Sequence, residues 1–200
     1  MLPSVYLKYS KIFEEHGFSL YLVGGSVRDY LLNKEVRDLD FVTDATPEEV
    51  LSIVPNGNGR FAKYGVISIK ENDEPIDIVT FRHEVGYADS RHPNKVTFVK
   101  DMYLDSCRRD FTINAMYMDA RGGVYDFHGG LKDLRDGKIR FVGKASTRVR
   151  EDPLRILRAR RFAKRFDFTF DGKTKKAIDD GEPLLEKINP EKVIMEKKKE

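Results

Sequence analysis

The fold is decided by residues 20–43, which read LYLVGGSVRDYLLNKEVRDLDFVT. The apolar and breaker residues predict, in order, a strand over 20–23, a turn at Gly24 and Gly25, a short helix over 26–32 and a strand over 38–42. Two neighbouring glycines let the backbone come close to a ligand, and the first N–H groups of the helix favour an anion. We therefore expect a phosphate group at this turn, with Arg28 available to bind it.

Two carboxylates follow in the same stretch. Asp38 and Asp40 are two residues apart on the expected strand, so they should project from one face while Leu39 and Phe41 point into the core. Like charges repel unless a cation lies between them, and hard divalent cations favour oxygen ligands. A pair of glycines on its own often forms only a turn, and an Asp-x-Asp sequence on its own is often part of a solvated loop. Their combination in one short stretch favours a nucleotide site in which Asp38 and Asp40 hold metal ions.

A third carboxylate is expected on a later strand. Residues 75–82 are largely apolar apart from Asp77. A lone acid in an apolar strand is costly unless it is paired or metal-bound. Asp77 is therefore a candidate either to complete the metal site or to take a proton from an attacking hydroxyl. The alternative is a salt bridge to Arg82 or another base.

The bulk composition excludes several classes of protein. The 200 residues are 40% hydrophobic and 34% charged with a net charge of +3, which is typical of one globular domain or of one domain and part of another. Basic residues outnumber acids over 148–165, which indicates either a nucleic-acid contact or a solvated helix face. The single cysteine, Cys107, excludes an internal disulfide and favours a reducing, cytoplasmic location. No apolar run has membrane-spanning length, so we expect no membrane partner, and the sequence indicates no protein partner.

Other segments carry local signals. A helix is expected over 5–16, and a second one begins with the capping box at Thr46 and Glu49. The polar stretch over 83–95 has no period and predicts a mobile loop. From about residue 144 the sequence pattern becomes that of helices, and Asp152 is the expected N-cap of one of them.

Five motifs occur in order over 18–166: LVGGSVRD with DLD, IVTFR, RRDFTINAM, DFHGGLKDL and REDPLRILRARRF. With them the chain resembles the N-terminal half of the class II tRNA nucleotidyltransferases, the CCA-adding enzymes, which share their head with bacterial poly(A) polymerases. The resemblance implies an α+β fold, with a polymerase-β-type head of a small mixed sheet and helices on one face in 1–143. It also implies the start of an α-helical neck in 144–200, which we expect to continue into a larger helical region.

The resemblance also implies roles for individual residues. Those matching the triphosphate motif are Gly24, Gly25, Ser26 and Arg28, and those matching the metal carboxylates are Asp38 and Asp40. Those matching the ribose-sensing motif are Arg109, Asp110 and Asn114, and those matching a hinge between head and neck are Asp126, Gly130 and Asp133. Those matching the base-selecting pair are Asp152 and Arg155, with Arg158 and Arg161 placed to help bind phosphates. The segment before the double arginine departs from the family, because 104–107 read LDSC where an acidic pair and an apolar residue are commoner.

The base-selecting pair also has a chemical rationale. On a helix Asp152 and Arg155 would be neighbours that face one ligand, or else an ordinary surface salt bridge. A carboxylate only accepts hydrogen bonds and a guanidinium only donates them. Cytosine and adenine each offer an amino donor beside a ring-nitrogen acceptor, whereas uracil and guanine offer a carbonyl beside an N–H. The pair therefore suits C and A and needs no nucleic-acid template.

The expected function is template-independent addition of C and A from CTP and ATP to the 3′ end of tRNA, with Mg²⁺ as cofactor and a two-metal mechanism. An A-adding enzyme or a poly(A) polymerase is the alternative within this chemistry, and the retained segment 83–95 argues against an enzyme that adds only C. The alternative of another class is a non-catalytic fragment that binds nucleotide or RNA.

Overall fold

The structure is a computed structural model that describes residues 1–36, 38–87 and 93–198. These residues form two compact units, each described here by itself. The sheet unit comprises Met1–His83, Val96–Arg108 and Asn114–Phe127, and the helical unit comprises Glu84–Lys95, Arg109–Ile113 and His128–Glu200. The expected domain boundary after residue 143 stays a prediction, because the compact units divide the chain at other points.

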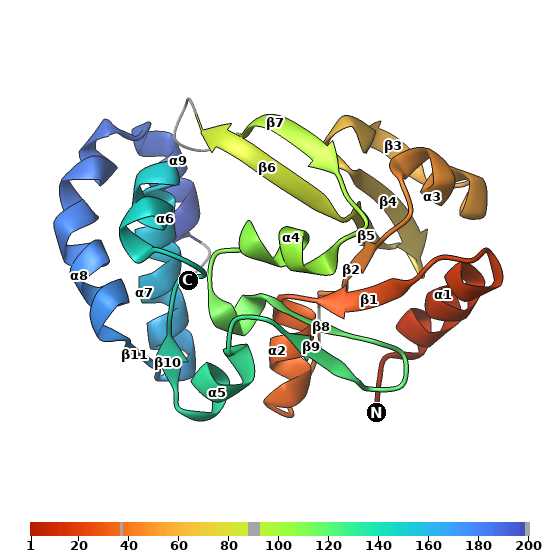
Figure 1. The fold of residues 1–200 in the computed structure, drawn as a ribbon, viewed down its shortest axis with the longest axis horizontal. Coiled ribbons are helices and arrows are strands. Elements are labelled where there is room, and N and C mark those ends of the chain that lie inside the picture. The colour runs from red at the N-terminus through yellow and green to blue at the C-terminus, as the bar shows by residue number, and fades with distance from the viewer. Residues whose placement is uncertain (37, 88–92, 199–200) are drawn as a thin grey trace. The chain divides into compact units, whose positions relative to one another are not determined.

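A seven-stranded sheet forms the centre of the sheet unit (Figure 1). Its strands are β1 (Leu20–Val23), β2 (Asp40–Thr43), β3 (Asn58–Phe61), β4 (Val66–Glu71), β5 (Glu74–Thr80), β8 (Met116–Met118) and β9 (Val124–Asp126). Their order is β3-β4-β5-β2-β1-β8-β9. Within this sheet β2 and β5 are parallel, whereas β1–β2, β1–β8, β3–β4, β4–β5 and β8–β9 are antiparallel, so the sheet is mixed and the expected α+β class is confirmed.

One face of this sheet is covered by α1 (Ser4–Glu15) and α3 (Pro47–Ile53). Leu22 of β1 lies opposite Phe41 on one neighbouring strand and Met118 on the other, so all three point to this face. The buried Tyr6 of α1 donates from its hydroxyl to the carbonyls of Leu20 at 3.0 Å and Met118 at 2.9 Å. An aromatic side chain of α1 thereby binds two strands at once.

The other face has its own apolar cluster. Val23, Val42, Phe81 and Tyr117 are buried there, and Met102 of α4 (Met102–Cys107) packs against them. Helices therefore contribute side chains to both faces of the sheet. The longest helix of the unit, α1, lies on the face that it shares with α3.

The segment 83–95 differs from the sequence-based expectation of a loop. Its described part contains β6 (Arg82–Tyr87) and β7 (Pro93–Phe98), which form a separate two-stranded sheet, and 88–92 lie outside the described residues. A two-stranded ribbon can leave many side chains in solvent, so it needs no alternation of apolar residues. The polar composition therefore gave no strand signal.

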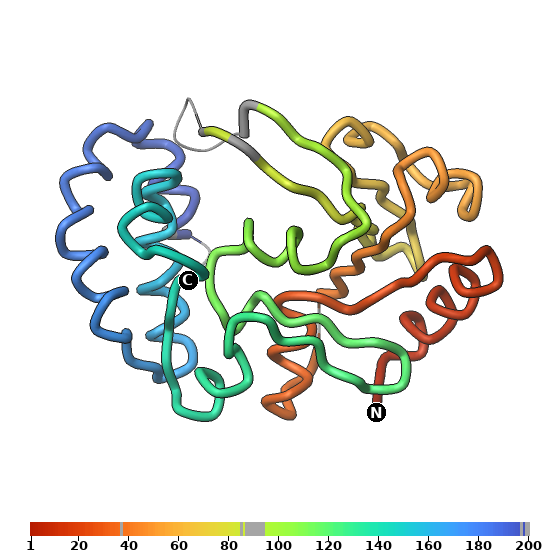
Figure 2. Tube along the Cα trace, in the orientation of Figure 1, coloured from red at the N-terminus to blue at the C-terminus, as the bar shows by residue number. Residues whose placement is uncertain are grey.

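The helical unit consists mainly of short helices, whose coils can be followed in Figure 2, together with a pair of short parallel strands. Its regular elements are α5 (Gly130–Arg135), β10 (Lys138–Ile139), α6 (Ala145–Glu151), α7 (Leu154–Phe166), β11 (Thr169–Phe170), α8 (Gly172–Gly181) and α9 (Pro190–Lys197). α6 packs against α8 and α7 against α9. The rings of Phe111, Phe141 and Phe162 meet in the core, with centroids 4.9 Å apart for the first pair and 5.7 Å for Phe111 and Phe162.

The start of α7 corrects one expectation. Asp152 is not the N-cap but the residue that ends α6, and Pro153 is the N-cap of α7. Asp152 has an extended backbone, yet its Oδ1 accepts a hydrogen bond from the N–H of Leu154 at 3.1 Å. The carboxylate therefore still satisfies the N–H of the first residue of α7, which is the role expected of it. In the described ranges no helix is long and apolar enough to cross a membrane.

Candidate functional site

The glycine turn lies between β1 and α2 (Gly25–Leu31). Gly24 has φ 66° and ψ −124°, a conformation that a residue with a side chain rarely adopts. Its N–H donates to the carbonyl of Met116 at 3.2 Å. A β-carbon on Gly25 would lie 3.4 Å from Nη2 of Arg28, so the second glycine keeps the backbone beside this guanidinium.

Arg28 lies on α2 and its side chain is 4% exposed. Its Nε and Nη2 both contact Oδ1 of Asp29 at 2.8 Å, and its Nη1 donates to Oδ1 of Asn114 at 2.6 Å. The sequence assigned Arg28 to phosphates and Asn114 to the ribose, and the structure brings the two side chains into direct contact. Asp29 was not predicted, because adjacent residues on a helix give no spacing signal.

Ser26 connects the glycine turn to the carboxylates. Its hydroxyl, on a side chain that is almost wholly buried, donates to the carbonyl of Asp38 at 2.8 Å and accepts from the N–H of Asp40 at 2.9 Å. The backbone of the Asp-x-Asp segment is therefore held to the start of α2. The sequence indicated Ser26 only as a triphosphate ligand and did not show this second use.

The strand argument for the two carboxylates was wrong at Asp38. β2 begins at Asp40, and Asp38 lies before it in a bend. Phe41 is fully buried as expected, but Leu39 is only partly buried and lines the same cleft as the aspartates. Ser26, and not strand alternation, is what holds Asp38 beside Asp40.

All three candidate carboxylates line one cleft of about 380 Å³ in the sheet unit. Asp40 and Asp77 are direct neighbours on the parallel strands β2 and β5. Asp77 is exposed and accepts a hydrogen bond from the hydroxyl of Ser68 at 2.5 Å. Asp77 is therefore not a buried acid, because the side chains of β5 alternate and Asp77 faces solvent between buried Ile76 and Ile78. The alternative partner, Arg82, donates instead to the carbonyl of Tyr64.

The donor set of this cleft suits magnesium. Among the residues that the structure describes, no group of three or more His, Cys, Asp or Glu side chains is arranged to hold a metal ion. Mg²⁺ does not need such a cage, because it keeps several waters and is usually held by one or two carboxylates together with substrate phosphates. The exposed oxygens of Asp38 and Asp40 meet that requirement.

In the helical unit, Arg158 of α7 joins residues from two motifs. Its Nη2 contacts Oδ2 of Asp152 at 2.7 Å, and its Nε lies 3.5 Å from Oδ2 of Asp110. Burial lowers the pKa of Arg158, but the charges of Asp110 and Asp152 outweigh that effect and raise the pKa above its ordinary value. The structure thus brings together a predicted ribose-motif residue, a predicted base-selecting residue and a predicted phosphate ligand.

Arg155 has different partners from Asp152. Its Nη1 contacts Oε2 of Glu151 at 2.8 Å and donates to the carbonyl of Arg148 at 2.8 Å. The guanidinium of Arg148 contacts the same Glu151 oxygen at 2.5 Å and donates to the carbonyl of Arg109 at 2.8 Å. Glu151 and Arg148 were not predicted, although their spacings of three and four residues were a usable signal.

Arg161 and Asp133, two further residues with a role implied by the sequence motifs, contact other side chains of the helical unit. Arg161 contacts Glu196 of α9 at 3.2 Å. Asp133 of the expected hinge is buried, and it accepts from the hydroxyl of Thr112 at 2.7 Å and from Nε of Arg140 at 2.9 Å. Asp126 ends β9 and Gly130 begins α5.

Comparison with known proteins identifies the class to which this fold and these motifs belong. Residues 20–140 match the family described as the poly A polymerase head domain, so the chain belongs to that family. Within it, the chain is similar to CCA-adding enzymes. The enzyme of Lactobacillus johnsonii is 44% identical over 195 residues, which are 96% of this chain and 49% of that protein.

Solved structures agree with this assignment. The crystal structure of the Bacillus stearothermophilus CCA-adding enzyme in complex with CTP has a TM-score of 0.85 and 37% identity, covering 95% of this chain and 46% of that one. A tRNA nucleotidyltransferase complexed with a primer tRNA and an incoming ATP analog has a TM-score of 0.77 and 35% identity, covering 94% of this chain and 54% of that one. The chain spans about half the length of the curated relatives it matches. The family expected from the motifs is confirmed.

Proposed function

We propose that this chain is the nucleotidyl-transferring part of a CCA-adding enzyme, which adds C and A from CTP and ATP to the 3′ end of tRNA. The observation that carries the proposal is the single cleft lined by Asp38, Asp40 and Asp77. The similarity to proteins that bind CTP, and to one that binds a primer tRNA and an ATP analog, supports the choice of substrates.

The glycine turn and Arg28 are the proposed triphosphate ligands. Gly25, which is partly exposed, begins α2, and Arg28 provides a guanidinium that matches phosphate geometry. Because Asn114 accepts a hydrogen bond from Arg28, the amide is held in one orientation, which suits recognition of a ribose hydroxyl. Arg109 and Asp110 are proposed to share in this recognition.

The proposed reaction is an in-line displacement at the α-phosphorus of the nucleotide. A bond forms between that phosphorus and the 3′-oxygen of the RNA, and the bond to the leaving pyrophosphate breaks. Asp77 is exposed beside Asp40 and has a free carboxylate lone pair to accept the hydroxyl proton. Mg²⁺, held by Asp38 and Asp40, would neutralise phosphate charge and favour ionisation of the hydroxyl.

Base selection is proposed for Asp152 and Arg155. Both side chains are almost wholly buried, and their partners Arg158 and Glu151 restrict their orientation. The fixed acceptor of Asp152 and the fixed donor of Arg155 match the hydrogen-bonding groups of C and A and oppose those of U and G. A mismatched base would leave buried polar groups without partners, at roughly 1–3 kcal/mol each.

The first experiment is Mg²⁺-dependent extension of a tRNA transcript that lacks its terminal CCA. The transcript is offered each ribonucleotide alone and then CTP together with ATP. We expect C, C and A to be added, and we expect D38N and D40N to lose at least 100-fold in rate, on the order of the loss of an electrostatic catalytic group. The matched control is D73N, which changes an exposed aspartate that does not line the cleft.

The possible results separate the alternatives. Addition of A alone would replace the proposal with an A-adding enzyme or a poly(A) polymerase. Binding of CTP and ATP without any extension would leave a nucleotide-binding fragment. Unchanged rates in D38N and D40N, with D73N as the reference, would refute the assignment of these two aspartates.

A further inference from the structure

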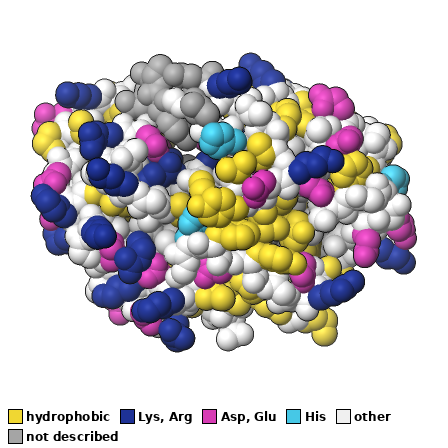
Figure 3. Space-filling view, in the orientation of Figure 1, with side chains coloured by type: hydrophobic (Ala, Val, Ile, Leu, Met, Phe, Trp, Pro, Cys, Tyr) yellow, Lys and Arg dark blue, Asp and Glu magenta, His cyan; other side chains and the backbone are white. Residues whose placement is uncertain are grey.

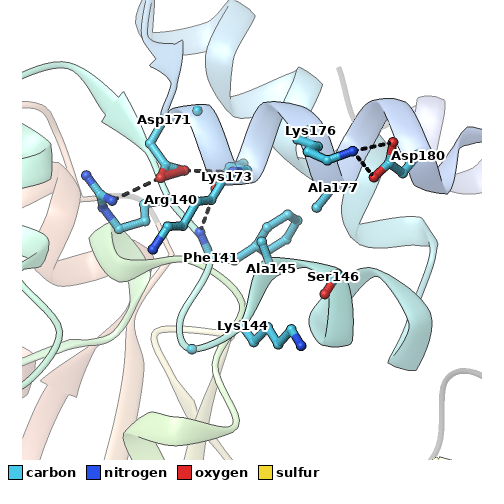
Figure 4. Close-up of a pocket in the computed structure, with 13 residues that line it drawn as sticks. Arg140, Phe141, Lys144, Ala145, Ser146, Asp171, Lys173, Lys176, Ala177 and Asp180 are labelled. Carbon is cyan, nitrogen blue, oxygen red and sulfur yellow. Dashed lines mark hydrogen bonds and ion pairs between the residues drawn. The ribbon is translucent and has the colours of Figure 1, made fainter.

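A second cleft lies within the helical unit, separate from the carboxylate cleft in sequence and in composition. It has a volume of about 630 Å³, and its two walls come from residues 140–146 and from α8 with the residue that caps it (Figure 4). None of its lining residues belongs to the predicted nucleotide or metal ligands. The functional proposal above leaves this cleft without a role.

The floor of this cleft is apolar and buried. Phe141, Ala145 and Ala177 line it and are almost wholly buried, and Phe141 stacks on Phe111 behind it. Thr174 is also buried, and its hydroxyl accepts a hydrogen bond from the N–H of Phe141 at 3.2 Å. The floor therefore offers shape and apolar contact but no free charge.

Both carboxylates of the rim have a cationic partner. Asp171 accepts from Nη1 of Arg140 at 2.9 Å through one oxygen and from the N–H of Thr174 at 2.8 Å through the other. Asp180 accepts from Lys176 through both oxygens, at 3.1 and 2.8 Å. Arg140 also contacts Asp133, which does not line the cleft, so its charge is shared between two carboxylates.

Two cations of the rim remain. Lys144 lies in the turn before α6 and Lys173 in the first turn of α8, so they border the cleft from its two walls (Figure 4). Both are exposed, and in the described part of the chain neither makes an ion pair or a side-chain hydrogen bond. Lys and Arg side chains also gather over the helices at the left of Figure 3. The lining holds the four cations Arg140, Lys144, Lys173 and Lys176 against the two carboxylates Asp171 and Asp180, so the cleft itself carries a net positive charge.

We propose that this cleft binds a phosphodiester group of the RNA strand, outside the site of nucleotide addition. A phosphodiester carries one negative charge shared by two non-bridging oxygens, which Lys144 and Lys173, on the two walls of the cleft, can bind as point charges. The attached ribose can rest on the floor of Phe141 and Ala177. A volume of this size suits one nucleotide unit and is too small for a duplex. The inference rests on the proposed function, since that function supplies the RNA.

The test measures binding of a fluorescent tRNA minihelix with a single-stranded 3′ end, by anisotropy over a range of salt concentrations. The variant K144A/K173A is compared with K175A/K187A, which removes the same charge from exposed lysines that do not line the cleft. The loss of this one single-stranded phosphate contact should reduce the slope of log K against log salt by about 0.7. We expect the affinity to fall about 10-fold in K144A/K173A only, and the affinity for CTP to be unchanged in both variants.

The other outcomes overturn the proposal in distinguishable ways. Equal RNA binding by the two variants, with extension intact, would refute the cleft site and leave the proposed function standing. Binding of CTP without binding of RNA by the unaltered chain would refute both the RNA site and the RNA substrate. NMR shifts at the cleft with inorganic phosphate but not with RNA would assign it to free phosphate, and shifts with a poly-glutamate peptide alone would assign it to an acidic protein segment.

Discussion

Single side chains in this chain often fix the positions of other residues through hydrogen bonds. Asp105, in the segment that departs from the family pattern, is fully buried in the sheet unit. Its carboxylate accepts from the hydroxyl of Tyr117 at 2.7 Å, from the N–H of Arg82 at 3.1 Å and from Nε of Arg108 at 2.9 Å. One carboxylate therefore connects α4 with two other parts of the unit.

Replacing this carboxylate should be costly. We expect D105N to lower the free energy of unfolding by about 3 kcal/mol, because the amide replaces one oxygen of a fully buried carboxylate by an NH₂ group that faces a hydrogen-bond donor. Urea unfolding followed by circular dichroism measures the change. The control D179N, which removes an exposed carboxylate paired with Lys175, should change stability by less than about 1 kcal/mol. A D105N protein as stable as D179N would contradict the structural role.

Asp152 is the residue at which base selection can be tested directly. Its carboxylate is held by Arg158 at 2.7 Å and by the N–H of Leu154 at 3.1 Å. We expect D152A to lower kcat/KM for CTP by about 10- to 100-fold, since one lost hydrogen bond to a charged group is worth about 1.5–3 kcal/mol. The preference for CTP over UTP should fall with it. Steady-state extension with each nucleotide measures both, and D136A, an exposed aspartate of the same unit, should leave both unchanged.

At the scale of elements, α1 is attached to the β4–β5 hairpin by one charged cluster. Nζ of Lys8 contacts Oε1 of Glu71 at 2.8 Å, and the hydroxyl of Tyr9 donates to Oε2 at 3.0 Å. The hydrogen bond from Lys8, aided by that from Tyr9, lowers the pKa of Glu71 below its usual 4.5. The hydrogen bond to Glu71 raises the pKa of Lys8 above its usual 10.5.

These two shifts define a pH window for the stability of the cluster. The contribution of Glu71 is present above pH 4.5 and is lost as the pH falls through its lowered folded-state pKa. The contribution of Lys8 is present below pH 10.5 and is lost as the pH rises through its raised folded-state pKa. We therefore expect K8M to have a lower Tm than the unaltered chain between these two pH limits. In stronger acid, where Glu71 is protonated, the two proteins should have the same Tm. Thermal scans across pH test this, with K11M as the control on the same helix.

Some elements of this chain can be predicted from residues close together in the sequence, whereas others cannot. The capping box of Thr46 and Glu49 predicted the start of α3, and both of its hydrogen bonds are present, at 2.7 and 3.3 Å. The signal was reliable because the interacting groups are three residues apart. β6 and β7 gave no such signal, because a strand pair depends on a partner across the ribbon and not on the residues beside it in the chain.

For the whole molecule, the net charge of +3 is a poor guide to where anions bind. Arg148, Arg155, Arg158 and Arg161 all contact carboxylates of the helical unit, so these members of the basic run contribute structure as well as charge. Lys144 and Lys173, outside the five motifs, have no such partners in the described ranges. The distribution of ion pairs, and not the count of basic residues, locates the surface on which an RNA strand would be held.

The sequence by itself determined the family, the order of most elements and the identity of the motif residues, because these depend on spacing within short segments. The glycine turn, the Asp-x-Asp segment and the capping box are local features of this kind. Only the tertiary structure decided that Ser26 holds Asp38 beside Asp40, that Asp77 faces solvent, and that Arg28 contacts Asn114. These facts depend on strand register and on packing between distant segments, where one added residue would turn a side chain to the opposite face.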